Sequence, residues 1–591
     1  MTNGRFGWDQ IRKFIENEPL SALFGYGDLV FETSAFPGEV RVSNVRVLGI
    51  LSQPDSFAKS GLLVGRLVAN LTFMKALFRL GDLQEVRFFI GENSEKAAVE
   101  RVQSLAPSGV RVTAQNLLTL PDALQDGAVD AIHFSEVSAR FASTIHLRNR
   151  FASKNIPVTG QIHSLSYPAS MRTYQHLFLS NPAACDAVFC STVAGRDVLN
   201  NCMTEVVDRL ARRGLPNQTL QWSLPVVPLG VDVPALGQGD RHATRVALDI
   251  EKDAFVFLSI GRFTEYDKMD LFPVVQAFAS FRARLPPEER AYLVLAGASQ
   301  GTETARMVQL WAKALKVADW VKIRVNFADE EKGGLLAAAD AFVSMTDNPQ
   351  ETYGLSVVEA MAAGLPVLVS DFNGYKNTVT EEVGIKVPTR WNMDVEYLSD
   401  LAPLLYERPL HLFLGQGIEI DLKALEEGFY RLFSQPSLRA QMAKAARARA
   451  QKLFDWSVVI PQYLATWNRL ARLERPVGQE RLDISRMSYR GSFAHYPTEW
   501  ANMERVLVRS EWSRHVVTDH CRHPIYPELS SLFSGEQVVA ALTLAEQPVR
   551  RSELQSRMVQ SDRESEYWRA GVLIAWLIKH GLLTDGSRAT P

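Results

Sequence analysis

The chain has 591 residues, 46% of them hydrophobic and 22% charged, and its formal net charge is −2. This composition is typical of globular proteins, and the chain is long enough for about three domains. The net charge near zero argues against nucleic acid or an anionic membrane as the main partner. The sequence shows no apolar run of the ~18 residues that a transmembrane segment needs, no signal peptide at its start and no CxxC spacing among its four cysteines. We therefore expect a cytoplasmic protein with reduced thiols.

In chain order, residues 1–44 are expected to form an N-terminal extension without recognisable chemistry. From residue 45, short apolar runs rich in β-formers alternate with longer helical patterns, which is typical of βαβ units in a doubly wound parallel sheet. The predicted strands of the first half are 45–51, 85–91, 129–135, 156–163 and 187–192.

A Pro/Gly-rich link at 226–240 separates this half from a second series of the same kind. Its predicted strands are 254–263, 291–299, 321–327, 341–346, 365–371 and 384–388. The fold class is therefore α/β, with two consecutive Rossmann-like domains. Ligands of such sheets bind at the carboxyl ends of the strands, so two facing sheets would form a cleft.

The stretch "DNPQETYGLSVVEAMAAGLPVLVSD" carries Glu351 in a loop and Glu359 in the helix that follows Gly354. A buried carboxylate is costly unless it is paired or hydrogen-bonded. A helix amino terminus with a glycine is an anion site, and carboxylates beside it would accept hydrogen bonds from hydroxyls. An anion together with hydroxyls describes a nucleotide sugar.

Glu351-x7-Glu359 in this stretch resembles the signature of retaining GT-B glycosyltransferases of family four, the group 1 glycosyltransferases. "LSIGRFTEYDKMDLFPVVQAF" resembles the family's strand, Gly-Arg, Lys and helix, and "VVPLGVD" resembles its hinge. "RARAQKLFDWSVVIPQYLATWNRL" is similar to its closing helix, and "FAKSGLLVGRL" occupies the place of its glycine-rich loop. The resemblance covers about residues 45–473. It implies a GT-B fold whose parts are an acceptor domain at 45–235, a donor domain at 236–455 and a helix at 456–475 that crosses back to the first domain.

The resemblance also implies roles for individual residues. Arg262 and Lys268 would grip the donor diphosphate, Glu351 would hold a hydroxyl of the transferred sugar, and His163 would stand near that sugar. Glu359 would bind the ribose, and the remaining donor-binding residues would contact the phosphates, the sugar or the base: Gly61, Asn326, Phe327, Tyr353, Gly354 and Leu355.

These residues suit the chemistry of sugar transfer. Negative charge develops on the phosphate of the departing nucleoside diphosphate, and positive groups beside it would stabilise that charge. Arg262 and Lys268 supply them, and no Asp-x-Asp stands in a suitable loop, so we expect no metal and no cofactor beyond a UDP- or GDP-sugar co-substrate. The expected function is sugar transfer to a glycan, protein or small-molecule acceptor, and the resemblance implies a front-face, retaining route. A GT-B epimerase or hydrolase, or a non-catalytic scaffold that binds sugar or protein, remains the alternative.

Structural explanations compete for several residues. Glu359 could be an ordinary charge near a helix start, Gly61 a turn residue, and His163 or His133 a core histidine. Zinc is a further alternative in "RHVVTDHCRHP", whose ligand types are suitable but lack a second cluster at finger spacing; its candidates are His515, His520, Cys521 and His523.

Residues 480–591 lie beyond the resemblance and are predicted to form an appended, mostly helical module. Ser534 and Gln537 are spaced as a capping box, helices follow at 549–558 and 565–581, and "LLT" is a candidate strand. Three helices and a strand resemble a winged helix. From residue 481 onward there are 14 Lys and Arg against 13 Asp and Glu, a net charge of +1, which argues against nucleic acid. The module would recognise a glycan or protein acceptor, or it would serve packing or oligomerisation.

Overall fold

The computed structural model describes residues 45–51, 65–91, 95–180, 182–214, 222–299, 303–474, 487–518 and 525–586. Among the predictions, the N-terminal extension, Gly61 and the His520, Cys521 and His523 part of the zinc alternative lie outside these residues.

The first half builds a six-stranded parallel sheet with the order β3-β2-β1-β4-β5-β6. Its strands are β1 (Val47–Ile50), β2 (Glu85–Ile90), β3 (Arg111–Asn116), β4 (Ala131–Phe134), β5 (Val158–Gln161) and β6 (Ala187–Phe189). Its helices are α2 (Gly65–Leu80), α3 (Lys96–Gln103), α4 (Leu120–Gln125), α5 (Ala139–Phe151), α6 (Pro168–Ser180) and α7 (Val193–Ala211). The sequence did not predict β3, because this edge strand is partly exposed and its residues, RVTAQN, form no apolar run.

The second half repeats this topology with the strand order β12-β11-β10-β7-β8-β9. Its strands are β7 (Phe255–Ile260), β8 (Ala291–Gly297), β9 (Val321–Val325), β10 (Ala341–Ser344), β11 (Val367–Ser370) and β12 (Gly384–Val387). Its helices are α8 (Arg241–Ala247), α9 (Phe272–Ala283), α10 (Glu303–Ala314), α11 (Glu331–Ala338), α12 (Leu355–Ala362) and α13 (Tyr375–Thr378). Both sheets therefore have the doubly wound order in which the ligand crevice lies at the switch point between the first and fourth strands. Two such sheets in one chain confirm the predicted GT-B architecture.

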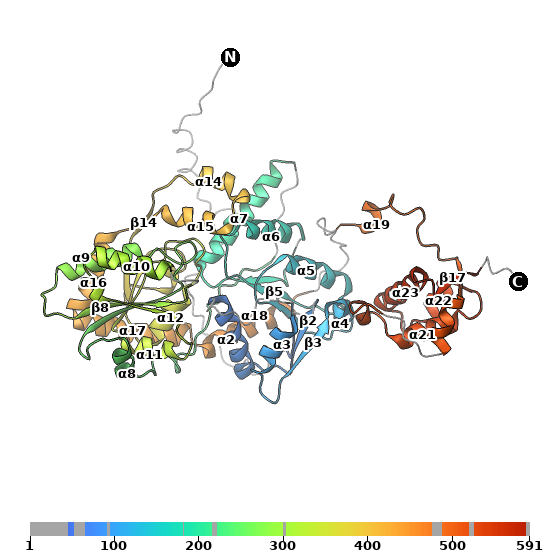
Figure 1. Ribbon diagram of the computed structural model, residues 1–591, viewed down its shortest axis with the longest axis horizontal. Coiled ribbons are helices and arrows are strands. Elements are labelled where there is room, and N and C mark those ends of the chain that lie inside the picture. The colour runs from blue at the N-terminus through green and yellow to red at the C-terminus, as the bar shows by residue number, and fades with distance from the viewer. Residues whose placement is uncertain are drawn as a thin grey trace, which may run out of the picture. The chain divides into compact units, whose positions relative to one another are not determined.

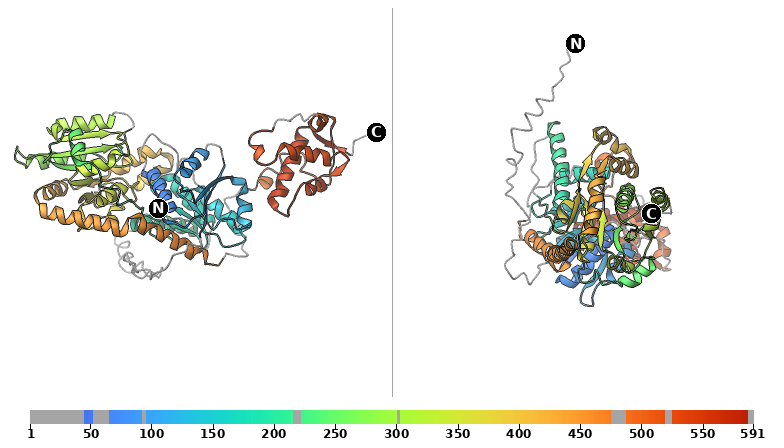
Figure 2. Two further views of the ribbon diagram at one scale, coloured as in Figure 1. Left: turned by 90° about the horizontal axis from the view of Figure 1, so that it is seen from below. Right: turned by 90° about the vertical axis from the view of Figure 1, so that its left-hand side faces the viewer.

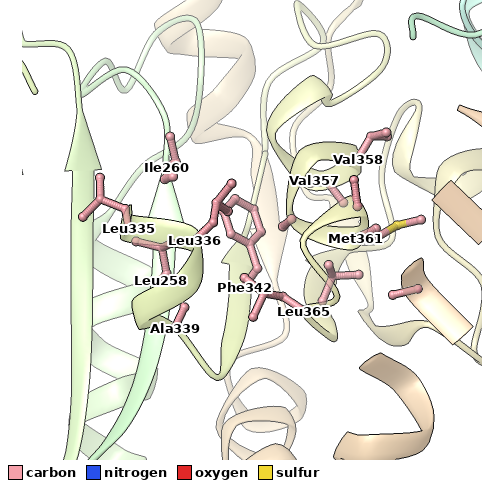
Figure 3. Packing of buried hydrophobic residues seen from close by; sticks show 14 of the residues in the cluster. Leu258, Ile260, Leu335, Leu336, Ala339, Phe342, Val357, Val358, Met361 and Leu365 are labelled. Carbon is pink, nitrogen blue, oxygen red and sulfur yellow. The ribbon is translucent and has the colours of Figure 1, made fainter. Parts of the chain in front are cut away.

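Alternating side chains of β7 explain why helices cover both faces of the second sheet (Figure 1). Phe255 and Phe257 pack with α9 and α16 (Leu422–Ser434), whereas Leu258 and Ile260 pack with α11, α12 and α17 (Pro436–Leu453). Figure 3 shows Leu258 and Ile260 beside α11, with Phe342 between them and α12. This core holds the loops after β7 and the start of α12 in fixed positions.

α18 (Trp456–Ala471) follows α17 but packs on the first sheet, and Figure 2 shows the two helices in succession along the two sheets. Trp467 of α18 is fully buried and donates from Nε1 to Thr159 Oγ1 at 3.0 Å. Tyr463 donates to Gln161 Oε1 at 2.7 Å. Through these bonds α18 supports β5, whose carboxyl end contributes to the candidate site.

Strands β13 (Thr389–Trp391) and β14 (Ile418–Ile420) form a smaller antiparallel pair. Helices α14 (Glu396–Leu401) and α15 (Glu407–Gln416) lie between these strands in the sequence. The C-terminal module has its own core and a three-stranded sheet in the order β16-β15-β17. Its strands are β15 (Val506–Arg509), β16 (Val549–Arg550) and β17 (Leu583–Asp585), and its helices are α19 (Tyr489–Ser492), α20 (Arg514–Thr518), α21 (Gly535–Leu544), α22 (Arg551–Arg557) and α23 (Glu564–Lys579). The predicted capping box of Ser534 and Gln537 is confirmed. Within the described ranges, no helix combines the length and apolar character that crossing a membrane requires.

Candidate active site

A cavity of about 690 Å³ lies at the carboxyl ends of strands from both sheets. The first half contributes the segments that follow β4 and β5, together with one face of α6. The second half contributes the segments that follow β7, β8 and β10, together with the start of α12. The cavity therefore includes the switch point of the second sheet, between β7 and β10, where a doubly wound sheet binds its ligand.

Lys268 and Glu351 form an ion pair in this cavity, with 2.6 Å between Lys268 Nζ and Glu351 Oε2. Burial disfavours the ammonium, but Glu351 and the phenol of Tyr375 outweigh it and raise the pKa of Lys268 above its usual range. Burial would likewise raise the pKa of Glu351, but the charge and hydrogen bond of Lys268 and two backbone amides lower it. Both groups are therefore ionised at neutral pH.

The two amides that bind Glu351 belong to the start of α12. Tyr353 N and Gly354 N donate to Glu351 Oε1 at 3.2 and 2.9 Å. Gly354 is the N-cap residue and has φ +87°, a left-handed conformation that favours glycine. A Cβ there would overlap the ring of Tyr375. Glycine thus allows the helix to begin against Tyr375, with its amino terminus at the cavity.

Arg262 lies in the loop after β7, and its side chain is 26% exposed. Its Nη1 donates to Asp267 Oδ2 at 2.6 Å, and Thr264 Oγ1 donates to the other oxygen of Asp267. The positive side chain faces the cavity with one donor already directed to a carboxylate.

Glu359 projects from the first half of α12 and is paired with Lys332, whose Nζ lies 2.7 Å from Glu359 Oε1. Both residues line the cavity. Sequence reasoning missed Lys332, which lies outside the motif that singled out Glu359. One signal could have identified it: Lys332 stands at the start of the helix after β9, and helix starts in such a sheet face the same edge as the other site loops.

Of the other predicted residues, some line the cavity and some do not. His163, Phe327, Tyr353 and Leu355 line the cavity. His163 Nε2 lies 3.2 Å from Asn70 Oδ1.

Asn326 is not among the residues that line the cavity. It adopts φ +51°, and its side-chain oxygen accepts from Ser299 N at 2.9 Å, so it supports the loop after β8. His133 also lies away from the cavity. It is buried among aromatic rings and lies 3.0 Å from Thr159 Oγ1, and burial together with His163 lowers its pKa to about 3. His133 is therefore a neutral core histidine.

The first-half wall of the cavity is rich in hydroxyls. Tyr167, Ser170, Thr173 and Tyr174 come from the start and one face of α6. Burial and nearby Asp267 raise the pKa of Tyr167 to about 12, so it stays a neutral hydroxyl. These residues were not singled out from the sequence, although their spacing places them together once residues 168–180 are assigned to a helix. The wall can form hydrogen bonds with a polyhydroxylated ligand.

Comparison with known proteins relates the second half to a family. Residues 240–402 match the family model described as "Glycosyl transferases group 1". A D-inositol 3-phosphate glycosyltransferase of Geodermatophilus obscurus is 32% identical over 199 residues, which cover 33% of this chain and 42% of the relative. One of Actinosynnema mirum is 34% identical over 165 residues, covering 27% and 38%. The chain thus spans less than half the length of these relatives.

Two similar solved structures show lower identity. A glycosyltransferase from Rickettsia africae has a TM-score of 0.49 and 14% identity, covering 72% of this chain and 98% of that chain. Anabaena HepE, solved with UDP and glucose, has a TM-score of 0.48 and 17% identity, covering 73% and 100%. The segment matched by the family model contains Arg262, Lys268, Lys332, Glu351 and Glu359.

Proposed function

We propose that this chain, which carries the domain of the group 1 glycosyl transferases at residues 240–402, transfers a sugar from a nucleotide-sugar donor to an acceptor hydroxyl. The observation that carries the proposal is the placement of Lys268 and Glu351 at the β7/β10 switch point, in contact with the amino terminus of α12. A cation and a helix amino terminus at one crevice suit a diphosphate, and carboxylates beside them suit sugar hydroxyls.

In the proposed reaction, the bond between the anomeric carbon and the diphosphate oxygen breaks, and the electron pair leaves with the nucleoside diphosphate. The acceptor oxygen forms the new bond from the same face, which retains the configuration, and its proton passes to the departing phosphate. Lys268 and Arg262 stabilise the charge that grows on that phosphate. Each of them is held by a carboxylate, Glu351 or Asp267, so each is oriented before the donor binds.

We assign donor recognition to the remaining second-half residues of the cavity. Glu359, fixed through one oxygen by Lys332, would accept hydrogen bonds from the ribose hydroxyls with its carboxylate. Glu351 would hold a hydroxyl of the transferred sugar, and Phe327 would pack near the base. The fixed cations carry the phosphate charge in this proposal, so we expect EDTA to leave turnover unchanged. A clear loss that manganese restores would contradict this part of the mechanism.

We place the acceptor against the first-half wall. This wall carries Ser164, Ser170, Thr173 and the carboxylate of Glu136, whereas the Lys and Arg side chains that line the cavity come from the second half. Hydroxyls and a carboxylate recognise a polyol. Because the curated relatives are named for D-inositol 3-phosphate, we propose a polyol acceptor and would test D-inositol 3-phosphate beside myo-inositol.

The test is incubation with a panel of UDP-, GDP- and ADP-sugars, with and without these acceptors, while release of nucleoside diphosphate is measured. We expect one donor to be consumed faster with an acceptor, and the product to retain the anomeric configuration. Acceptor-independent release or isomerisation of the donor would instead indicate a hydrolase or epimerase. Binding in a thermal-shift assay without any release would indicate a scaffold.

A further inference from the structure

Three consecutive buried side chains after β10 are directed at the loop that carries Lys268. Thr346 and Asn348 are 0% exposed and Asp347 is 3% exposed. Thr346 Oγ1 donates to the carbonyl of Lys268 itself at 2.9 Å. The Asp347 carboxyl accepts from Asp270 N at 3.2 Å. These three residues are called the loop clamp below.

Asn348 forms hydrogen bonds with three backbone groups through its buried side chain. Its Nδ2 donates to Tyr266 O at 2.6 Å and to His411 O at 2.9 Å, and its Oδ1 accepts from Gln350 N at 3.0 Å. A side-chain amide can donate two hydrogen bonds and accept others at one buried place, which an ionised carboxylate cannot do. Asn348 thereby ties the Lys268 loop to α15 and to the segment that carries Glu351.

The loop clamp holds the backbone on both sides of Lys268 as well as at Lys268. Residue 266 is held by Asn348, 268 by Thr346 and 270 by Asp347. The loop also closes on itself, because Lys268 N donates to Thr264 O at 3.1 Å. The position of the ammonium relative to Glu351 therefore depends on side chains that do not line the cavity.

We propose that Thr346, Asp347 and Asn348 are positioning residues that set the place of Lys268 against the leaving diphosphate. This inference rests on the proposed function and adds residues that act through another group. A displacement of a catalytic group by about 1 Å can lower the rate by ~10²-fold, even when the change is far from the reacting atoms. Loss of the loop clamp should therefore lower kcat more than it changes the KM of the donor.

The first experiment compares Thr346→Val with Thr346→Ser. Valine keeps the shape of threonine and removes the hydroxyl that binds the Lys268 carbonyl, whereas serine keeps the hydroxyl. We expect kcat for release of nucleoside diphosphate to fall by ~10-fold or more in the valine variant and to recover in the serine variant, with KM changed by less than ~3-fold. Thr144→Val is the matched control, because Thr144 is 2% exposed, donates to Arg140 O at 2.8 Å within α5 and does not line the cavity.

The second experiment compares Asn348→Asp with Asn155→Asp. Asn155 also donates from Nδ2 to backbone carbonyls, Leu470 O at 2.9 Å, Ala471 O at 3.4 Å and Leu473 O at 2.7 Å, but it does not line the cavity. Both variants leave backbone carbonyls without their donor and should lose thermal stability. We expect only Asn348→Asp to lower kcat per folded molecule.

If the Thr346→Val or Asn348→Asp variant has the same kcat as its control, or if Thr346→Ser does not restore kcat, the proposed positioning role of the loop clamp is wrong. The proposed function would remain intact. Wild-type protein that releases no nucleoside diphosphate from UDP-, GDP- or ADP-sugars would overturn both.

Discussion

Lys268 and Glu351 were assigned from the sequence to different parts of a donor, the diphosphate and the sugar, and the structure joins them in one ion pair. Glu359 is likewise joined to Lys332, and Arg262 to Asp267. Each cation of the cavity is thus held by a carboxylate, which fixes its direction. A diphosphate would meet cations that need no further ordering, and this favours stabilisation of the transition state over tight binding of the substrate.

Replacing either cation tests the assignment to the leaving group. Lys268→Ala and Arg262→Ala should each lower turnover by about 10²–10³-fold, because each removes one group that stabilises charge on the departing phosphate. Nucleoside diphosphate release is the measurement. Lys322→Ala serves as the control, since Lys322 pairs with fully exposed Asp249 and does not line the cavity. Near-normal turnover in either cavity variant would contradict the assignment.

The two glutamates should differ in product binding. Glu359→Gln is expected to weaken binding of the nucleoside diphosphate, because the ribose belongs to substrate and product alike. Glu351→Gln should leave that binding nearly intact and reduce sugar transfer. Calorimetric titration with UDP and GDP, beside turnover of the matching sugar donor, measures both effects. If the two variants bind the product equally, these roles are wrong.

The lowered pKa of Glu351 predicts a dependence of stability on pH. The pKa is lower in the folded state than in the unfolded state, so the unfolded chain binds more protons between the two values. The contribution of Glu351 to the free energy of unfolding is therefore complete above the unfolded pKa and is lost as the pH falls through the folded pKa. Denaturant unfolding from about pH 6 toward pH 3 should show the difference between wild type and Glu351→Gln shrinking. A difference that stays constant with pH would contradict this.

At the scale of elements, helix α12 shows how local sequence and packing combine. Its end follows from Gly364, which has φ +81°, as the sequence predicted. Its start depends on Gly354, whose left-handed backbone faces Tyr375. The hydroxyl of Tyr375 in turn forms a hydrogen bond of 2.8 Å with Ser344 Oγ, at the end of β10. The position of the helix amino terminus is thus set by a side chain 21 residues farther along the sequence.

The pair Gly354→Ala and Gly364→Ala separates these two effects. Both glycines have positive φ, so alanine costs about 1–2 kcal/mol of backbone energy at either place. At Gly364 a Cβ meets nothing within 4 Å, whereas at Gly354 it overlaps Tyr375. We expect Gly364→Ala to lose only the backbone term and to stay active. Gly354→Ala should be less stable and should lose donor turnover, and equal thermal unfolding of the two would contradict the role of Tyr375.

Partly exposed strands were the hardest to predict from sequence. Central strands such as β7 and β10 are buried on both faces and therefore appear as continuous apolar runs. β3 and β15 have partly exposed residues and mixed polarity, so their strand conformation depends on pairing with β2 and with β16 and β17. Pairing between distant segments leaves little trace in the local pattern.

At the scale of the whole molecule, the described residues of the C-terminal module, 487–518 and 525–586, have a core of their own. The contacts of α23 with the first half include ion pairs, with Arg563 2.7 Å from Asp126 and Arg569 3.0 Å from Asp122. They also include hydrogen bonds from Ser565 to Asp122 and from Arg569 to Leu118 O. These side chains are partly exposed, and surface ion pairs contribute only roughly 0–1 kcal/mol each. The two sheets should therefore not depend on the module for their stability.

Deleting residues 480–591 tests whether the module recognises the acceptor. If the module recognises the acceptor, hydrolysis of the donor by water persists, since it needs only the cavity, and transfer to the acceptor drops sharply. Light scattering on the same truncated chain tests the alternative. Unchanged transfer with an altered oligomeric state would favour an oligomerisation role, and an insoluble product would show that the module belongs to the core.

The sequence by itself determined the two doubly wound halves. It placed Arg262, Lys268 and Glu351 in loops after strands and Glu359 in a helix, because apolar periodicity and turn residues are local properties of the chain. Only the tertiary structure decided which charges are paired, that Lys332 joins Glu359, and that Asn326 supports a loop instead of lining the cavity. These features depend on strand order, which brings together side chains such as Lys268 and Glu351 that are 83 residues apart. Distances of that kind are set by packing of the whole sheet, and a local pattern does not encode them.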